Sequence, residues 1–343
     1  MTYWKQKKVL VTGGAGFIGC HVVRHLVAEG AGVSVLDNLQ SGTWAALQEI
    51  IADVGNCRID VSPDITDHRS VLHQPEGDIR CIQADVRDAG VVRLVVKELA
   101  PDVILHLAAN ASVPGSVEDP AYDFNSNTGG TFNVLEAVRL EKPDTRVVVV
   151  SSGAVYGEPV SFPITEESPL VPISPYGASK MAAETEARMF HVVYKIPVVT
   201  ARFFNTYGPG MPRFVVLDFL KKLKKNQDCL EILGTGRQMR DFTYVDDTVR
   251  GLLVLAEHGL AGQAYNIASG RSYTVTELAR VVIDVLGLTG RTRLSFTGES
   301  WVGDAQRWEV SIDKVVTLGY SPLVPLQEGV GKVAKWFSRS EDM

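Results

Sequence analysis

The chain has 343 residues, of which 45% are hydrophobic, and its formal net charge is −6. This length supports a large core in one domain or two, and the acidic balance argues against nucleic acid as a partner. The four cysteines show no metal-ligand spacing, so we expect free thiols, no metal site and a reducing compartment.

Targeting and membrane signals do not stand out in the sequence. The N-terminal residues lead at once into an apolar strand, so we expect no signal peptide. No apolar run reaches the ~18 residues that a membrane helix needs. We therefore expect a cytoplasmic protein that does not bind membranes. The basic run KKLKK at 221–225 predicts the solvated face of a helix rather than a nucleic-acid site.

Short apolar runs alternate with helical patterns over the first 203 residues. Runs that are apolar throughout are typical of a parallel sheet covered by helices on both faces. The predicted fold class is α/β, a doubly wound parallel sheet with right-handed crossovers. The predicted strands span residues 8–12, 33–36, 79–83, 103–107, 146–151 and 198–203, and the predicted helices 17–29, 44–54, 88–99, 122–139 and 176–194. Residues 55–78 are polar and turn-rich, and we expect a surface insertion there.

The alternation stops near residue 204, where Pro209, Gly210 and Pro212 interrupt the chain. Helical patterns follow at 214–225, 275–286 and 326–336 without regular strands between them. We predict a first domain over residues 1–203, to which roughly 240–268 return. A smaller, irregular α/β substrate domain is predicted over 204–239 and 269–343.

The turn after the first strand carries a dinucleotide fingerprint. It reads TGGAGFIG at 12–19, with glycines at 13, 16 and 19. Such glycines allow a tight turn and let the backbone approach a pyrophosphate at the helix N-terminus. Asp37 ends the second strand, 18 residues after Gly19. A carboxylate there accepts both ribose hydroxyls and repels a 2′-phosphate, which predicts NAD rather than NADP; the alternative is a turn cap.

Two further strand ends and one helix carry polar residues with two interpretations each. Asp85 and Val86 suit the adenine amino group and ring, and a simple turn aspartate is the alternative. His106 is expected to be a packed strand residue rather than a catalyst. Asn127 either ties strand ends together or contacts the cofactor.

A serine, a tyrosine and a lysine form the candidate catalytic set. Tyr176 and Lys180 stand four residues apart at the start of a predicted helix, and therefore share one helical face. A nearby ammonium favours the phenolate, so the tyrosine can act as a base. Ser152 ends the fifth strand, where ligands of open α/β sheets bind; the alternative is a strand-end capping serine.

These motifs resemble those of the extended short-chain dehydrogenase/reductases that modify nucleotide sugars, near the UDP-glucose 4-epimerases. The resemblance spans almost the whole chain. It is carried by TGGAGFIG at 12–19, Asp37-Asn38, Asp85-Val86, HLAA at 106–109, SSGAVYG at 151–157, YGASK at 176–180, RFFNTYGP at 202–209 and RDFTYVDD at 240–247.

The resemblance implies that the first domain binds NAD and that Ser152, Tyr176 and Lys180 act on a nucleotide sugar. It also implies that Asn205 and Arg240 contact the diphosphate of the nucleotide, for which an arginine is suited because it forms forked, charge-assisted hydrogen bonds. By this resemblance the NAD site takes Gly13, Gly16, Phe17, Ile18, Gly19, Asp37, Asn38, Ser41, Gly42, Asp85, Val86, Leu107, Ala108, Ala109, Asn127, Tyr176, Lys180 and Phe203. The substrate contacts implied are Val113, Ser152, Tyr176, Phe204, Asn205, Arg213, Arg240 and Asp304.

The pair Gly153-Ala154 helps to choose the reaction. The resemblance implies that dehydratases and decarboxylases of this family carry an acidic residue between the catalytic hydroxyl residue and VYG. A dehydratase needs one because the elimination of water requires an acid and a base beyond the tyrosine. Neither residue here can transfer a proton. We therefore predict a 4-epimerase. The alternatives are a dehydratase, a decarboxylase or a sugar oxidoreductase on the same scaffold, and, more remotely, a non-catalytic NAD-sensing protein.

Three features bear on the substrate and the assembly. Trp301 stands where many epimerases have an arginine, so one diphosphate contact is in doubt and Arg307 is a substitute. Arg213 suits a substrate carboxylate or a surface position equally, which makes a UDP-hexuronic acid a candidate beside a UDP-hexose. The resemblance also implies a homodimer that pairs helices 122–139 and 174–194 with their copies.

Overall fold

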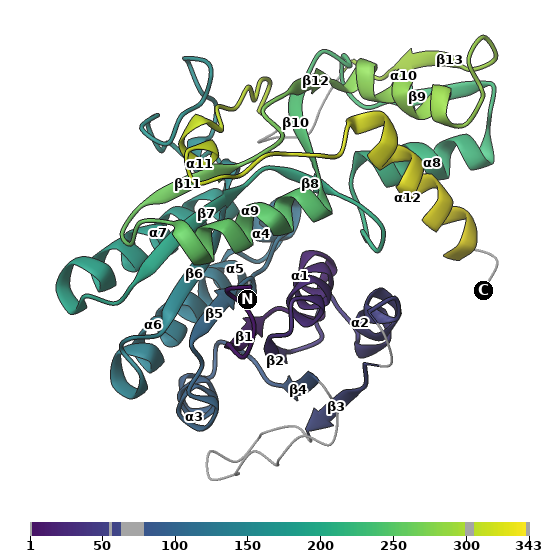
Figure 1. Cartoon of the computed structure of the whole chain (residues 1–343). Coiled ribbons are helices and arrows are strands. Elements are labelled where there is room, and N and C mark those ends of the chain that lie inside the picture. The colour runs from purple at the N-terminus through teal and green to yellow at the C-terminus, as the bar shows by residue number, and fades with distance from the viewer. Residues whose placement is uncertain (1, 55–56, 63–78, 299–304, 341–343) are drawn as a thin grey trace. The chain divides into compact units, whose positions relative to one another are not determined.

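The computed structural model describes residues 2–54, 57–62, 79–298 and 305–340 (Figure 1). The chain divides into two compact units. The first comprises Met1–Val155, Pro172–Arg202 and Leu252–Tyr265, and the second comprises Tyr156–Val171, Phe203–Gly251 and Asn266–Met343.

An eight-stranded sheet organises the first unit. The strand order is β11-β7-β6-β5-β1-β2-β4-β3, and each neighbouring pair from β3 to β6 is parallel. The chain starts at β1 in the middle, moves to one edge and then returns to the other side. This reversal confirms the predicted doubly wound sheet. The strands are β1 Lys8–Thr12, β2 Gly32–Asp37, β3 Ile59–Ser62, β4 Ile79–Gln83, β5 Val103–His106, β6 Arg146–Ser152, β7 Val198–Phe203 and β11 Ala264–Ile267.

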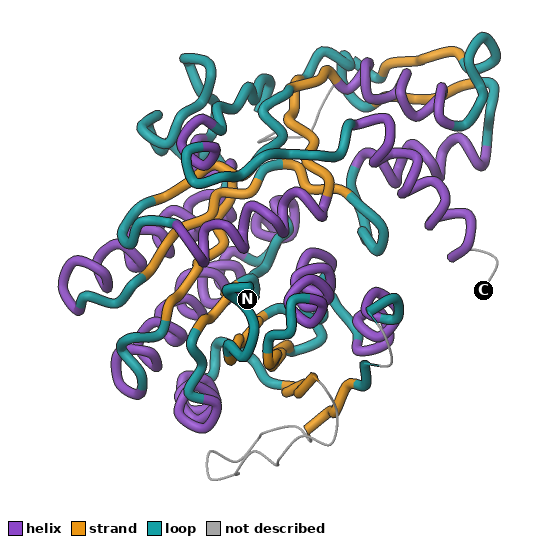
Figure 2. The backbone as a smooth tube through the Cα atoms, in the orientation of Figure 1, coloured by secondary structure: helices purple, strands orange, loops and turns teal. Residues whose placement is uncertain are grey.

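Helices connect these strands, and in Figure 2 they lie on both sides of the strands of the first unit. Two of them, α1 (Phe17–Ala28) and α2 (Trp44–Ile51), contact each other, and α3 (Ala89–Leu99), α6 (Gly130–Glu141) and α7 (Pro175–Tyr194) form a second contacting group. Branched aliphatic side chains of β1, β5 and β6 form one core with this second group. Such burial, at about 25 cal/mol per Å², holds the strand ends in place.

The predicted helix over 122–139 is wrong as a single element. Three elements replace it: α5 (Pro120–Phe124), the π-helix η1 (Asn125–Gly129) and α6. The wider π turn lets two successive residues reach Ser179 of α7. The Asn127 amide donates to the Ser179 hydroxyl (2.9 Å), and the Thr128 hydroxyl donates to the Ser179 carbonyl (3.0 Å).

The predicted insertion over 55–78 is also partly wrong. Residues 59–62 form β3, which pairs with β4 at the sheet edge, because this stretch (IDVS) can extend the parallel ladder. The rest of the insertion, residues 63–78, lies outside the described part of the chain.

The second unit contains a three-stranded sheet, in the order β12-β10-β8, and the two-stranded sheet β13-β9. Short polar strands such as these carry little apolar periodicity, which is why the sequence did not predict them. The elements of the described chain that have not yet been given are α4 Val113–Glu118, in the first unit, and η2 Gly153–Tyr156, β8 Asn205–Tyr207, α8 Val215–Lys225, β9 Cys229–Ile232, β10 Met239–Tyr244, α9 Val245–His258, β12 Ser272–Thr274, α10 Val275–Val285, β13 Arg293–Phe296, α11 Asp313–Val316 and α12 Leu326–Ser340.

The unit boundaries differ from those we expected. Residues 156–171 belong to the second unit, because Ile164 pairs with Val310 and its carbonyl accepts from the Asn266 amide. The returning segment is shorter than 240–268, since it comprises only Leu252–Tyr265.

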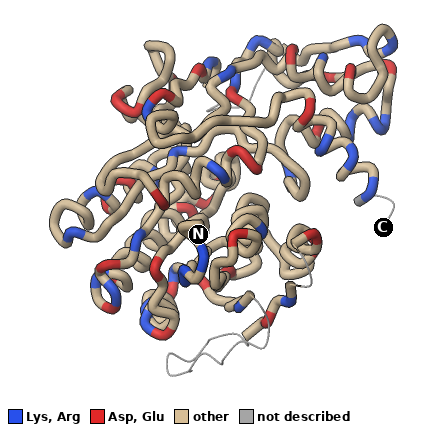
Figure 3. The backbone as a smooth tube through the Cα atoms, in the orientation of Figure 1, with Lys and Arg blue, Asp and Glu red and all other residues tan. Residues whose placement is uncertain are grey.

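Basic and acidic residues alternate along the backbone of both units (Figure 3). On α8, Lys221, Lys224 and Lys225 are exposed, and Lys222 forms an ion pair with Asp218 (3.0 Å). The basic run is therefore the solvated helix face that the sequence predicted. Among the helices of the described residues, none is both long and apolar enough to cross a membrane. In the same residues, no group of three His, Cys, Asp or Glu side chains is arranged to hold a metal ion.

Candidate active site

The glycine-rich turn between β1 and α1 is tightly packed at two positions and open at the third. Gly13 has a positive φ of 72°, and a Cβ on it would lie 2.7 Å from the Ala108 nitrogen. A Cβ on Gly19 would collide with the Gly13 carbonyl. Gly16 precedes α1 as its N-cap, and a Cβ there would meet only the Gly13 oxygen, at 3.3 Å. Phe17 and Ile18, both partly buried, begin the helix. The turn thus brings backbone without side chains to the N-terminus of α1, the kind of position at which a pyrophosphate binds.

Asp37 closes this turn from the end of β2. Its carboxylate is buried and accepts from the N–H groups of Ala15 (2.9 Å) and Leu39 (2.8 Å). Burial raises the pKa of Asp37, and these backbone donors act in the opposite direction. The turn-cap interpretation is therefore correct for this residue, and each oxygen still has a lone pair for a further donor. Gly42 packs against the Ala15 carbonyl, and Ser41 beside it is exposed.

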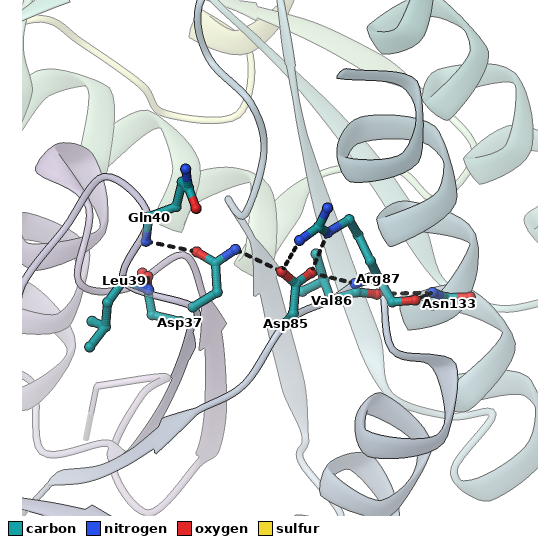
Figure 4. A network of polar contacts seen from close by, with 8 residues as sticks. Asp37, Leu39, Gln40, Asp85, Val86, Arg87 and Asn133 are labelled. Atoms are coloured by element: carbon teal, nitrogen blue, oxygen red, sulfur yellow. Dashed lines mark hydrogen bonds and ion pairs between the residues drawn. The ribbon is translucent and has the colours of Figure 1, made fainter. Parts of the chain in front are cut away.

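A second polar network joins the ends of β2 and β4 (Figure 4). The Asn38 amide donates to Asp85 (2.8 Å), and Arg87 donates to both oxygens of Asp85 (3.0 and 2.8 Å). Partial burial disfavours the charged form of Asp85, but the hydrogen bonds from Arg87 and Asn38 outweigh it and lower its pKa. The Val86 side chain is in the core, and its carbonyl accepts from the Asn133 amide. Asp85 is thus both a turn aspartate and an ionised acceptor at the strand end.

His106 is a packed residue, as the sequence predicted. It is buried between the hydroxyls of Thr12 (2.7 Å from Nδ1) and Thr131 (3.1 Å from Nε2). Burial lowers its pKa to about 3, so the ring is neutral. Thr131 donates to the Asn127 carbonyl (2.6 Å), so it must accept from Nε2–H, and Nδ1 accepts from Thr12. Beyond His106, the backbone of Leu107 and Ala108 packs on Gly13, and Ala109 follows, partly buried.

The N-terminal turn of α7 presents the tyrosine and the lysine on its buried face. Ser174 caps the helix and Pro175 starts it, both of which favour helix initiation. The Tyr176 N–H donates to the Ser116 hydroxyl (3.1 Å), and the Lys180 ammonium donates to the Val150 carbonyl (2.9 Å). Both side chains are buried, and burial lowers the pKa of Lys180 to about 8. The ammonium therefore loses its proton more easily than an exposed lysine does.

Ser152 lies at the end of β6, where the short turn η2 begins. Its hydroxyl accepts from the Ala154 N–H (3.2 Å), which is the capping role that the sequence left open. The Ala154 carbonyl lies so close to α7 that a Cβ on Gly177 would come within 2.6 Å of it. The Gly153-Ala154 turn therefore packs directly against the helix that carries Tyr176.

Asn127 has the first of its two predicted roles. It is fully buried, its oxygen accepts from the Asn110 N–H (2.8 Å), and its amide donates to Ser179 and Asp123. These bonds tie the end of β5 to α7. The predicted contact between Asn127 and the cofactor stays a prediction.

Two buried acids next to α7 escaped the sequence analysis. Asp123 of α5 accepts from Ser179 (2.5 Å), Asn110 (2.9 Å) and Asn127 (3.1 Å). Glu184 of α7 forms a forked ion pair with Arg202 of β7 (2.7 Å), and both side chains are buried. The i,i+4 spacings 123/127 and 180/184 were the available signals, but neither identifies a partner on a distant element.

Phe203, which we predicted as an NAD contact at the end of the first domain, belongs to the second unit together with Phe204, and both are buried. Phe204 stacks on Tyr156 (ring centroids 6.3 Å apart) and meets Trp308 edge-on (5.8 Å). The Arg240 guanidinium lies over the Trp308 ring at 5.1 Å and donates to the Met239 carbonyl. These aromatic contacts hold Phe204 and Arg240 in one cluster.

The other predicted substrate residues do not belong to this aromatic cluster. Asn205 starts β8, and its side-chain oxygen is buried with no hydrogen-bond partner. Arg213 is exposed and lies over the Phe214 ring (5.3 Å), which agrees with the surface alternative. Val113, in the first unit, starts α4 and is partly buried. Asp304, like Trp301, lies outside the described residues. Arg307 contacts Phe162 and pairs with Glu309.

Known proteins resemble this chain over nearly its whole length. The UDP-glucose 4-epimerase of Mycolicibacterium smegmatis is 32% identical over 337 residues, which cover 96% of this chain and 98% of the relative. The dTDP-D-glucose 4,6-dehydratase of Mus musculus is also 32% identical, over 97% of this chain and 89% of the relative. Relatives of similar identity thus carry two different activities.

A solved structure also resembles this chain over nearly its whole length. The dTDP-glucose 4,6-dehydratase of Streptomyces venezuelae, with NAD and TYD bound, superposes with a TM-score of 0.82 at 30% identity, over 98% of each chain. The family model described as GDP-mannose 4,6 dehydratase matches residues 10–317. This chain therefore belongs to that family, among the nucleotide-sugar epimerases and dehydratases of the extended short-chain dehydrogenase/reductases.

Proposed function

We propose that the protein is an NAD-dependent nucleotide-sugar 4-epimerase, in which Ser152, Tyr176 and Lys180 carry out the chemistry. The observation that carries the choice of reaction is the turn Gly153-Ala154. It packs against the start of α7 and offers no group that can donate or accept a proton.

The residues of the first unit fit NAD. The glycine turn is free of side chains where a pyrophosphate meets the N-terminus of α1, and Asp37 places a carboxylate at the end of β2 for the ribose hydroxyls. Asp37 would repel a 2′-phosphate, which favours NAD over NADP. The surface of Asp85, Asn38 and Ser41 at the neighbouring strand end suits the adenosine end of the same molecule.

The chemistry begins with the oxidation of the sugar at C4, which removes a proton from the C4 hydroxyl oxygen and a hydride from the C4 carbon. Tyr176, as phenolate, takes the proton from the C4 hydroxyl, and Ser152 hydrogen-bonds the same oxygen. Bound NAD supplies the hydride acceptor and, on the return, the hydride donor. The Lys180 ammonium favours the phenolate by its charge. When the 4-keto sugar presents its other face, Tyr176 returns the proton and the C4 configuration is inverted.

A dehydratase would need a further acid and base near the sugar. Of the two buried acids described at α7, Asp123 already accepts three hydrogen bonds, and Glu184 is paired with Arg202. Such a group does not reach a substrate. Epimerisation needs no acid or base beyond Tyr176, with Ser152 and Lys180 in support, and it is the reaction that this set supports best.

We take the substrate to be a UDP-hexose or a UDP-hexuronic acid. Arg240, held over Trp308, is the candidate for the diphosphate, and Asn205 has a buried acceptor that lacks a donor. Val113, Phe204 and Asp304 remain candidates for the sugar and the nucleotide. The exposed position of Arg213 weakens the argument for a hexuronic acid.

We also propose a homodimer through α6 and α7. These helices expose Phe132, Leu140, Met189, Val192 and Val193, an apolar group that is unusual on a monomer's surface. Light scattering coupled to gel filtration should give twice the mass of the chain, and a monomer at micromolar concentration would contradict this.

The test is turnover of candidate sugars by the purified protein without added NADH. The substrates are UDP-glucose, UDP-N-acetylglucosamine, UDP-glucuronate and dTDP-glucose, and the products are read by mass spectrometry and proton NMR. An unchanged mass with an inverted C4 coupling is expected. Loss of water or carbon dioxide would point to a dehydratase or decarboxylase. Tyr176→Phe should lower turnover by about 10³-fold, and an unaffected rate would remove the tyrosine from the mechanism.

A further inference from the structure

We propose that Asp123 is a positioning residue that acts through Lys180: it is the buried counter-charge that keeps the Lys180 ammonium protonated beside Tyr176. The inference rests on the proposed function, because it gives Lys180 and Tyr176 their roles there. Asp123 itself touches neither substrate nor cofactor.

Burial raises the pKa of Asp123, and the hydrogen-bond donors around its carboxylate stabilise the charged form against that rise. The residue is fully buried, and its two oxygens accept hydrogen bonds from the Ser179 hydroxyl and from the amides of Asn110 and Asn127. All three partners can donate, and such donors stabilise the charged form. Burial alone raises the pKa of Asp123, whereas these donors and the charge of Lys180 lower it.

The carboxylate is connected to the reacting helix by the residue next to Lys180. Ser179 donates to Asp123, accepts from Asn127 and lies within hydrogen-bond distance of the Tyr176 carbonyl (3.0 Å). The backbone carbonyl of Ser179 is held by Thr128 (3.0 Å). The π-helix and α5 therefore fix Asp123 against the turn of α7 that carries both Tyr176 and Lys180.

The charges around Lys180 leave Asp123 as the group that balances it. Lys180 interacts electrostatically with Asp123 of α5, with His106 of β5 and with Glu184 of its own helix, and Tyr176 stands one helical turn before it. His106 is neutral, with its pKa lowered by burial to about 3. Glu184 is already matched by the forked pair with Arg202. Without Asp123, this buried cluster would hold one uncompensated positive charge, which a site of low dielectric strongly disfavours.

Loss of the carboxylate should therefore act on two proton equilibria. Lys180, whose pKa burial already lowers to about 8, would lose its proton at lower pH. Tyr176 would then lack the ammonium that favours its phenolate, and its pKa would rise. The pH range in which a phenolate and an ammonium coexist would narrow from both sides.

The first test measures the Tyr176 titration directly. Tyrosinate absorbance of the NAD-loaded protein is followed against pH, and the curve of Tyr176→Phe is subtracted to remove the other tyrosines. Asp123→Asn and Asp123→Ser should raise the Tyr176 midpoint by about one pH unit, with about tenfold less turnover at pH 7. Asp123→Glu should return the midpoint towards that of the parent protein. Asp144→Asn removes a largely exposed carboxylate of the same unit and should leave it unchanged.

Ser179→Ala separates charge from structure. It removes the hydrogen bond to Asp123 but keeps the carboxylate, so the midpoint should move far less than in Asp123→Asn. An equal shift in Ser179→Ala, or an unmoved midpoint in a folded Asp123→Asn, overturns the inference. If neither neutral variant folds, carbon-13 NMR of the aspartate carboxyls decides, with Asp123→Glu to assign the signal. An ionised Asp123 at pH 7 supports the proposal, and a protonated one overturns it.

The two proposals fail in different ways. Full turnover by Tyr176→Phe would remove the proposed function, whatever the titrations show. Inactive Tyr176→Phe together with an unmoved midpoint in Asp123→Asn would remove only the role of Asp123.

Discussion

Two aspartates of the first unit, Asp85 and Asp123, belong to polar networks of opposite character. Asp85 lies at an accessible strand end and is held by Arg87 and Asn38, which lower its pKa. Asp123 is fully buried among neutral donors, and burial raises its pKa. In the first network, water replaces any partner that is removed. In the second, each donor or charge has no substitute. The chemistry is expected beside the second network, where a single charge has the larger effect.

The largest effect is expected from breaking the buried ion pair on α7. Glu184→Gln leaves the Arg202 guanidinium, also buried, without a counter-charge, and should lower the free energy of unfolding by about 3–5 kcal/mol. Urea denaturation at neutral pH measures this. Glu136→Gln is the matched control, because its pair with Arg139 on α6 is about one-third exposed; it should cost less than about 1 kcal/mol. An equal decrease in the free energy of unfolding in the two variants would contradict the prediction that the buried pair stabilises the protein more than the exposed one.

His106 should produce the next largest effect, and it depends on pH. The folded pKa of about 3 lies below the ordinary value of about 6.5. As pH falls from about 6.5 to about 3, His106 is protonated in the unfolded chain but stays neutral in the folded protein. The free energy of unfolding therefore decreases as the pH falls through this range. At pH 4 the loss is on the order of 3 kcal/mol.

The His106→Asn variant tests this contribution. It cannot take up the proton, so its stability should fall less between pH 7 and pH 4 than that of the parent protein. Urea denaturation at both pH values measures the difference. His258→Asn alters a largely exposed histidine and should follow the parent curve. Parallel pH dependences for His106→Asn and the parent would show that the ring is not held neutral.

The smallest effect is expected in the accessible network. Arg87→Ala removes the forked bond to Asp85, but Arg87 is 40% exposed and the bond is screened by water. The free energy of unfolding should change by less than about 1 kcal/mol. Thermal unfolding of the variant without cofactor measures this. A loss as large as that of Glu184→Gln would mean that the two networks do not differ as burial predicts.

Much of the fold was predictable because it is encoded in local patterns. The continuous apolar strands, the glycines at 13, 16 and 19 and the i,i+4 spacing of Tyr176 and Lys180 each follow from backbone geometry over a few residues. The break between α5 and α6 was not predictable, because a single π turn of five residues is too short to show a period of its own. The short strands of the second unit carried too few residues to show a period.

The sequence by itself determined the doubly wound sheet, the turn at 12–19 and the serine, tyrosine and lysine that we propose as catalytic. Tertiary structure decided which charges surround them. Asp123 and Ser179 are 56 residues apart in the chain and 2.5 Å apart in space, and Glu184 finds Arg202 on another element. Local periodicity specifies which face of an element is buried. The partner of a buried charge depends on which distant segments pack together, and at a buried position that partner decides whether the charge persists.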